Sequence, residues 1–178
     1  MTMEFARRLV DLMLFRRGPQ DMPGDQSSLV VSIAAYCIVL FIQVALVGSL
    51  AGALVQAGLA TLMLGLYAAT ILRLRGLSNR FNQTATSLFS SGAVLTLIML
   101  APTRALRPYL DALRSATDPS QVPMPSPLFA LVYLVVGIWG LAIYTHIYRN
   151  ALGVPIVLGV AVTLGFEVLL MLVFSVLG

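Results

Sequence analysis

The sequence is poor in charged residues, and it contains one cysteine, one histidine and no lysine. Charged residues make up 10% of its 178 residues, whereas an ordinary soluble domain contains about 25%. A soluble globular enzyme is therefore excluded, because so short a chain could not cover its apolar surface. The single cysteine excludes a disulfide scaffold. The single histidine leaves little material for a histidine metal site or a catalytic triad.

Sequence motifs of catalysis are also missing, since the chain has no GxSxG, HExxH, P-loop, CxxC or paired-carboxylate pattern. We therefore predict no catalytic residue, no metal site and no cofactor. Eleven arginines against seven acidic residues give a net charge of +4. In a soluble protein this balance would suggest nucleic acid. In a membrane protein it reflects arginines gathered in cytoplasmic loops, so no nucleic-acid partner is expected.

Long apolar runs are what the sequence has in abundance, with 59% hydrophobic residues. A spanning helix needs about 20 mostly apolar residues. We therefore predict an all-α fold, a polytopic transmembrane helical bundle with five spans and an N-terminal interfacial amphipathic helix. The membrane domain covers residues 27–178, with spans at about 28–47, 53–73, 84–101, 127–148 and 154–177.

Glycine and proline set two of these boundaries. The apolar block 29–72 is too long for one span, so we place a turn at 48–52, where glycine permits a tight reversal. The alternative is one tilted span with a re-entrant piece, which would give four spans. We expect the third span to stop at Pro102. An outer loop, residues 102–126, then contains a short amphipathic piece from Pro108 and a stiff proline-rich spacer.

Residues 1–26 are predicted to form a cytoplasmic amphipathic helix and a hinge. In this segment the charged and apolar side chains separate onto two helical faces. The charged face holds Glu4, Arg7, Arg8 and Asp11, and the apolar face holds Phe5, Leu9, Leu12 and Met13. Such a helix should lie in the membrane interface with its apolar face in the acyl chains. Glycine and proline at 18–19 and 23–24 predict the hinge into the first span.

The arginines predict the orientation in the membrane. With the N-terminus inside, the inner segments hold Arg7, Arg8, Arg16, Arg17, Arg73, Arg75, Arg80 and Arg149, and the outer segments hold Arg104, Arg107 and Arg114. Because positive residues accumulate in cytoplasmic loops, this asymmetry favours an N-terminus inside and a C-terminus outside. The expected location is a bacterial inner membrane.

Glu167 is the strongest candidate for a functional side chain. It lies about thirteen residues into the last span, a depth of about 20 Å, where a carboxylate is costly and should face the bundle or a wet cavity. Other spans offer polar side chains at similar depth, and we predict one buried polar cluster of Glu167, Thr163, Gln43, Gln56, Thr96 and Tyr133. Three roles remain open: a polar clasp between helices with Glu167 hydrogen-bonded to an amide or tyrosine, a proton or ligand site, and a contact with a partner subunit.

The inner rim of the bundle is basic and rich in amides. Its predicted members are Arg73, Arg75, Arg80, Asn82, Gln83, His146 and Arg149. Ordinary positive-inside topology explains such a surface. The functional alternative is binding of anionic lipid headgroups or of a protein partner. His146 is either an interfacial anchor beside Tyr144 and Tyr148 or a proton acceptor at the mouth of the bundle.

Two segments carry a resemblance to a known family. They are the polar run at residues 80–89 (RFNQTATSLF) and the last hairpin at residues 146–155 (HIYRNALGVP). Together with five spans after an amphipathic segment, they resemble small bacterial membrane proteins related to the Yip family of five-span proteins. The resemblance implies a non-enzymatic membrane organiser or adaptor, with no catalytic residues to transfer.

The sequence thus supports two hypotheses of function. The first is a non-enzymatic accessory, scaffold or adaptor subunit that acts through helix–helix and cytoplasmic-face contacts, with a membrane-protein partner or a second copy of itself. The second is a small transporter or proton-coupled carrier that uses Glu167. An intramembrane enzyme is disfavoured, because no nucleophile and base stand together in the sequence.

Overall fold

The computed structural model of the chain describes residues 3–116, 118, 122 and 125–177. Over these residues the chain forms α-helices and two short 3-10 helices and contains no strand. The long helices are α2 (Gln26–Ala45), α3 (Leu50–Leu74), α4 (Phe81–Ser115), α5 (Pro127–Leu152) and α6 (Ile156–Leu177). The short elements are α1 (Met3–Met13), η1 (Pro19–Asp21) and η2 (Ser78–Arg80). Within the described part of the chain, five helices are long and apolar enough to cross a membrane. The prediction of an all-α, five-span bundle is confirmed.

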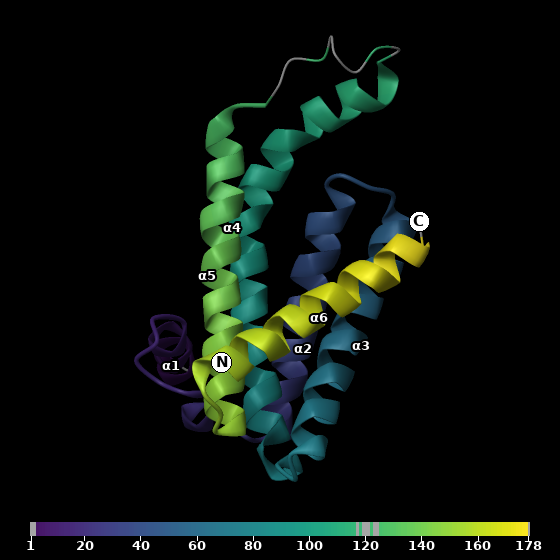
Figure 1. The fold of residues 1–178 in the computed structure, drawn as a ribbon. Helices are drawn as coiled ribbons and strands as arrows, with labels where there is room; N and C mark the ends of the chain where they lie inside the picture. The colour runs from purple at the N-terminus through teal and green to yellow at the C-terminus, as the bar shows by residue number, and fades with distance from the viewer. Residues whose placement is uncertain (1–2, 117, 119–121, 123–124, 178) are drawn as a thin grey trace.

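The five long helices run alternately up and down, with α4 at the centre (Figure 1). Of the most apolar stretch of α4, 61% is buried inside the protein, against 17% to 22% for the other four helices. Helices α2, α3 and α5 pack around α4. Helix α6 packs on α5 and α3 but crosses the bundle obliquely, so that it diverges from α5 along its length (Figure 1).

Small hydroxyl residues let α4 be buried on most sides. Ser87, Ser90 and Ser91 are almost fully enclosed, and each hydroxyl donates to the carbonyl four residues earlier, at 2.6–2.8 Å. A hydroxyl satisfied by its own helix needs no partner from a neighbouring helix. The side chains are also short, so the backbones of α2 and α5 can come close.

Helix α4 does not stop at Pro102, and this expectation is wrong. Both Pro102 and Pro108 lie inside the helix, which continues to Ser115. Each proline removes one amide donor and pushes on the preceding turn, which bends the helix without ending it. The last turns of α4 lean away from α5 (Figure 1). Arg114 Nη2 donates to the carbonyl of Val47, 2.7 Å away, and so ties this end to the α2–α3 turn.

The apolar face of α1 is covered by protein and not by acyl chains, which corrects a second expectation. Phe5, Leu9, Leu12 and Met13 are all less than 10% exposed and belong to the main apolar core. The amphipathic pattern predicts that the apolar face is buried. It does not distinguish burial in lipid from burial against protein, because both are apolar. Helix α1 lies across the long helices and is seen nearly along its axis in Figure 1.

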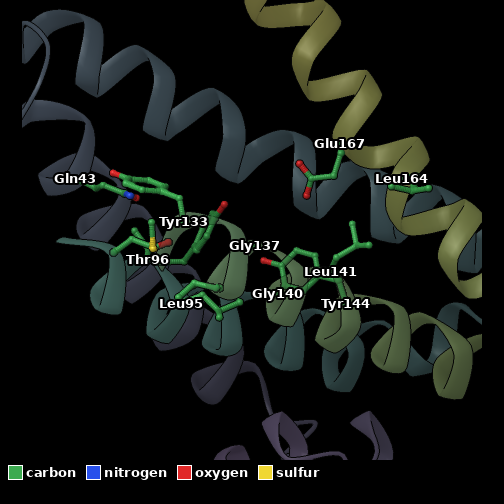
Figure 2. Close-up of a pocket in the computed structure, with 14 residues that line it drawn as sticks. Gln43, Leu95, Thr96, Tyr133, Gly137, Gly140, Leu141, Tyr144, Leu164 and Glu167 are labelled. Atoms are coloured by element: carbon green, nitrogen blue, oxygen red, sulfur yellow. The ribbon is translucent and has the colours of Figure 1, made fainter. Parts of the chain in front are cut away.

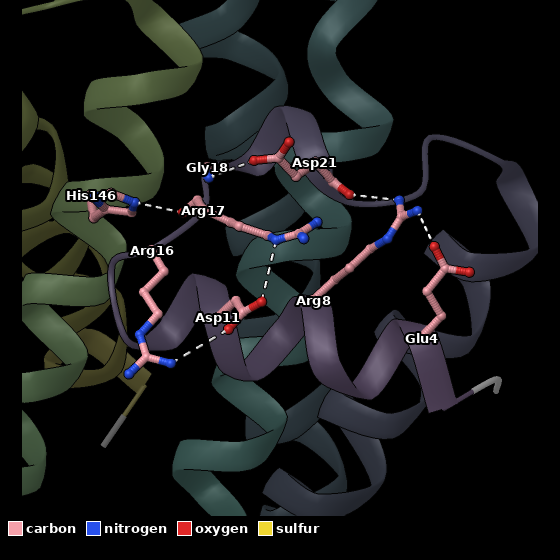
Figure 3. Close-up of polar contacts among 8 residues, drawn as sticks. All are labelled: Glu4, Arg8, Asp11, Arg16, Arg17, Gly18, Asp21 and His146. Atoms are coloured by element: carbon pink, nitrogen blue, oxygen red, sulfur yellow. Dashed lines mark hydrogen bonds and ion pairs between the residues drawn. The ribbon is translucent and has the colours of Figure 1, made fainter.

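The connection between α1 and α2 is fastened by hydrogen bonds and ion pairs and is not an open hinge (Figure 3). Arg8 Nη1 donates to the Asp21 carbonyl at 2.9 Å, and the Gly18 amide donates to Asp21 Oδ2 at 3.0 Å. Asp11 pairs with Arg17 at 3.3 Å. His146 on α5 holds the connection to the bundle, since its Nε2 lies 2.8 Å from the Arg17 carbonyl oxygen.

Candidate functional site

A cavity of about 590 Å³ opens between α2, α4, α5 and α6 (Figure 2). It holds four of the six residues of the predicted polar cluster: Gln43, Thr96, Tyr133 and Glu167. The remaining lining is Tyr36, Gly92, Leu95, Met99, Val136, Gly137, Gly140, Leu141, Tyr144 and Leu164. The structure therefore gathers polar side chains from four helices around one space, inside the part of the bundle formed by the membrane spans.

Gly92 on α4 makes room for the aromatic wall of this cavity. A Cβ at this position would lie 2.6 Å from Tyr144 Oη and 2.9 Å from Tyr36 Cε2. Real Cβ atoms do not come so close to other heavy atoms, so any larger residue would displace one ring or both. The absence of a side chain at Gly92 thus allows both tyrosines to face the cavity.

Gln43 and Tyr133, which line the cavity, belong to a chain of hydrogen bonds across three helices. Gln43 Nε2 on α2 donates to Thr103 Oγ1 on α4 at 3.3 Å, and Thr103 Oγ1 lies 2.8 Å from Tyr133 Oη on α5. Sequence reasoning missed Thr103, because it follows Pro102, where we expected the helix to stop. The signal was available: Thr96 and Thr103 are seven residues apart and lie on one face of a continuous helix.

Glu167 faces the cavity from α6, opposite the α5 residues Tyr133 and Tyr144 (Figure 2). Its side chain is exposed, and no residue in the described part of the chain forms a hydrogen bond or an ion pair with it. The polar clasp, in which an amide or tyrosine bonds to Glu167, is therefore not formed. The carboxyl group is instead available to a partner, a ligand or a proton that enters the cavity.

Two members of the predicted cluster lie elsewhere. Thr163 is fully buried against α5, with Oγ1 3.4 Å from Thr145 Oγ1 and 3.0 Å from the Gly159 carbonyl oxygen. Gln56 is exposed on the outer surface of α3, so its predicted burial is wrong. The buried stripe of α3 contains Ala53, Ala57, Ala60, Leu64 and Ala68. Gln56 lies at the expected depth along α3, but on a face of the helix next to this buried stripe.

Some side chains of the basic rim form hydrogen bonds within the fold, and others have no polar partner among the described residues. Arg80 Nη1 donates to the Ala151 carbonyl at 2.8 Å, at the end of α5. Asn82 and Gln83 donate to carbonyls of the α1–α2 connection, at 3.0 Å and 3.2 Å. By contrast, the guanidinium groups of Arg73, Arg75 and Arg149 are exposed and have no polar partner among the described residues.

The polar side chains that line the cavity are acidic or neutral. The cavity offers one carboxyl group, one amide, three phenols and a hydroxyl, and none of the described residues that line it is basic. Within the described residues, no group of three histidine, cysteine or acidic side chains could hold a metal ion. Such a set can accept hydrogen bonds, hold a proton or receive a positive group, but it lacks a nucleophile activated by a base.

Comparison of the chain with protein-family models, curated proteins and solved structures finds no match. The resemblance to Yip-related proteins therefore stays a prediction.

Proposed function

We propose that the protein is a non-enzymatic integral membrane protein that acts by binding, as an accessory, scaffold or adaptor subunit. The observation that carries this proposal is the unpartnered carboxyl group of Glu167 at an open intramembrane cavity. A carboxylate at that depth is costly unless another group satisfies it. A transmembrane helix of a partner, or of a second copy, that brings a donor to Glu167 would satisfy it.

The walls of the cavity are suited to such a helix. On α5, Gly137 and Gly140 line the space, and small residues allow two helix backbones to approach closely. A Cβ at Gly137 would meet no other atom within 4 Å, so this wall is open. Helix α6 is only 17% buried over its most apolar stretch, which leaves most of its surface to lipid or to a partner.

A proton-coupled carrier is the second candidate, and it is favoured by the same carboxyl group. Glu167 is the only carboxylic acid among the described residues that line the cavity, and the hydroxyl groups of Tyr133 and Thr96 line the same space. The two candidates differ in what they require of residue 167. A partner contact needs a hydrogen-bonding group, whereas a carrier needs a group that titrates.

Photocrosslinking in the native membrane tests the first candidate. A photoreactive amino acid at Leu164, which lines the cavity, should give one stoichiometric adduct with a membrane protein. The same amino acid at Leu62, which is 57% exposed on α3, is the control and should label only lipid. Glu167→Gln should keep the adduct, and Glu167→Leu should lose it. Equal labelling from both positions would refute the proposal.

Proton flux into vesicles tests the second candidate. The purified chain is reconstituted with a trapped pH indicator, and a membrane potential is imposed. A flux that Glu167→Gln abolishes while the protein stays folded would favour the carrier. An absence of flux, together with the adduct from Leu164, would favour the binding subunit.

The orientation and the bacterial inner membrane belong to the same proposal. Eight arginines lie in α1, in the segment that follows it and at the α3–α4 and α5–α6 connections, and three lie in the last part of α4. The positive-inside rule then places α1 in the cytoplasm and the end of α6 outside. A C-terminal reporter that is active only in the periplasm should be active, and a cytoplasmic reporter should be silent. The reverse pattern would overturn this orientation.

A further inference from the structure

A second hollow, of about 430 Å³, runs between α5 and α6 and is distinct in chemistry from the cavity of Glu167. Its lining is Phe15, Ile138, Leu141, Ala142, Thr145, His146, Arg149, Ile156 and Val160. It shares Leu141 with the first cavity but none of the polar groups there. Most of its wall is apolar, and its one charged side chain is Arg149. We call it the Arg149 groove.

The groove is polar at one end and apolar at the other. Arg149 and His146 lie in the last two turns of α5. Ile138 lies eleven residues earlier, about 16 Å farther into the bundle at 1.5 Å per residue. On α6 the wall begins at the first residue, Ile156. The polar end is therefore at the helix ends, where a membrane surface would lie, and the apolar end points toward the middle of the span.

The charge at the polar end is uncompensated. Arg149 is exposed and pairs with no acidic residue in the described part of the chain. Arg16 and Arg17 follow Phe15 directly and share the single carboxylate of Asp11, at 3.9 Å and 3.3 Å. These two guanidinium groups are on the segment that carries Phe15 but are not among the residues that line the groove, so Arg149 is the charge that faces it. The imidazole of His146 is engaged by the Arg17 carbonyl and adds no free donor.

The wall formed by Phe15 is held at a conformational cost. Phe15, two residues after the end of α1, has φ at +62°, a left-handed conformation that glycine adopts far more readily. The Phe15 amide donates to the Leu12 carbonyl at 3.0 Å, and the Arg16 amide donates to the Asp11 carbonyl at 2.8 Å, the pattern that usually has glycine at this position. The Phe15 side chain, which occupies this position instead of glycine, packs edge-on to His146, with ring centroids 5.4 Å apart.

We propose that the Arg149 groove holds one anionic glycerophospholipid, with its phosphate at Arg149 and an acyl chain along Ile138 and Val160. Charge complementarity favours a lipid with net negative charge over a zwitterionic one, because the Arg149 guanidinium group at the groove has no acidic partner among the described residues. The long apolar wall favours a lipid over a free phosphate compound, because a soluble anion would leave this wall uncovered. The proposal does not depend on the function of the Glu167 cavity.

The only tryptophan provides the assay. Trp139 is on α5, and its Nε1 donates to the Met13 carbonyl at 3.2 Å. It precedes Ala142 by three residues and His146 by seven, so it flanks the groove. The full chain is reconstituted in phosphatidylcholine bilayers that contain a fraction of brominated phosphatidylglycerol, and quenching of Trp139 is measured. Brominated phosphatidylcholine gives the reference for lipid without net charge.

We expect phosphatidylglycerol to bind about fivefold more tightly than phosphatidylcholine, the preference that about one arginine confers. Arg149→Gln should remove this preference, whereas Arg75→Gln, an exposed arginine outside the groove, should keep it. Val160→Phe fills the groove but retains Arg149, and it should also remove the preference. An unchanged emission maximum of Trp139 and unchanged quenching by brominated phosphatidylcholine verify that each variant is folded.

Three results would overturn the proposal. Equal losses in Arg149→Gln and Arg75→Gln would mean that general surface charge, and not the groove, attracts the lipid. An unchanged preference in Val160→Phe would mean that no acyl chain enters the groove. Full displacement of brominated phosphatidylglycerol by millimolar sn-glycerol 1-phosphate would assign the site to a soluble phosphate compound.

Discussion

Leu12→Ala should release α1 from the bundle while the five long helices stay assembled. Leu12 has no exposed surface and lies in the core, on the same face as Phe5, Leu9 and Met13. Removing a fully buried leucine side chain costs about 2–5 kcal/mol, because apolar contacts are lost and a cavity remains. Helix α1 precedes the membrane spans, so this cost is expected to appear as local opening of α1.

Tryptic cleavage after Arg17 measures this opening. The Arg17 carbonyl is bound by His146, so the bond that follows it is protected while α1 is docked. When opening and closing are fast, cleavage tracks the opening equilibrium. A loss of about 2 kcal/mol then accelerates cleavage about thirtyfold, and larger losses accelerate it further. The N-terminal fragment is followed by mass spectrometry, and the rest of the chain should stay intact.

Leu14→Ala is the matched control, since Leu14 lies just after α1 and is 46% exposed. A substitution of a surface residue should change stability by no more than about 0.5 kcal/mol, or about twofold in rate. If the two variants were cleaved at the same rate, Leu12 would not be buried by protein.

Three further outcomes are expected from thermal unfolding in detergent and from hydrogen exchange. Gly92→Ala should cost about 1–3 kcal/mol, because its Cβ would fall 2.6 Å from a tyrosine oxygen, whereas Gly137→Ala should be neutral. Tyr67→Phe should lower the melting temperature, because its hydroxyl donates to an α6 carbonyl at 2.7 Å; Tyr148→Phe should not, because that buried hydroxyl finds no partner among the described residues. Asp25→Ala should speed hydrogen exchange at the start of α2. In the unsubstituted protein, hydrogen bonds from the next two serines lower the pKa of Asp25 from 3.8 to about 2. Protection of these amides from exchange should therefore hold above pH 3.8 and be lost as the pH falls through about 2.

The number and approximate bounds of the spans could be predicted because apolar length alone determines them. The predicted first span, 28–47, corresponds to α2 at Gln26–Ala45, and the glycine turn lies between α2 and α3 as expected. The end of α4 could not be predicted from the local rule for proline. Contacts distant in sequence hold it, namely Arg114 at Val47 and Thr103 between Gln43 and Tyr133.

The sequence predicted how deep the residues of the candidate site lie along their spans, but not which way their side chains point. Depth places Gln43, Thr96, Tyr133 and Glu167 at one level, and the structure brings these four around one cavity. The direction of a side chain depends on which stripe of its helix packs inward. On α3 the buried stripe is made largely of alanines, which are no more apolar than their neighbours, so hydropathy could not show that Gln56 faces outward.

The composition of α4 has a consequence for biogenesis. A segment with so many serines and threonines is the least apolar of the five spans, and it is also the most enclosed. During synthesis it emerges after α2 and α3, so α2 can cover one flank at once. The other flank stays bare until α5 has been made. Chains interrupted before residue 127 would therefore present the hydroxyl-rich surface of α4 to lipid. Retention of α4 in the bilayer thus requires that α5 be completed.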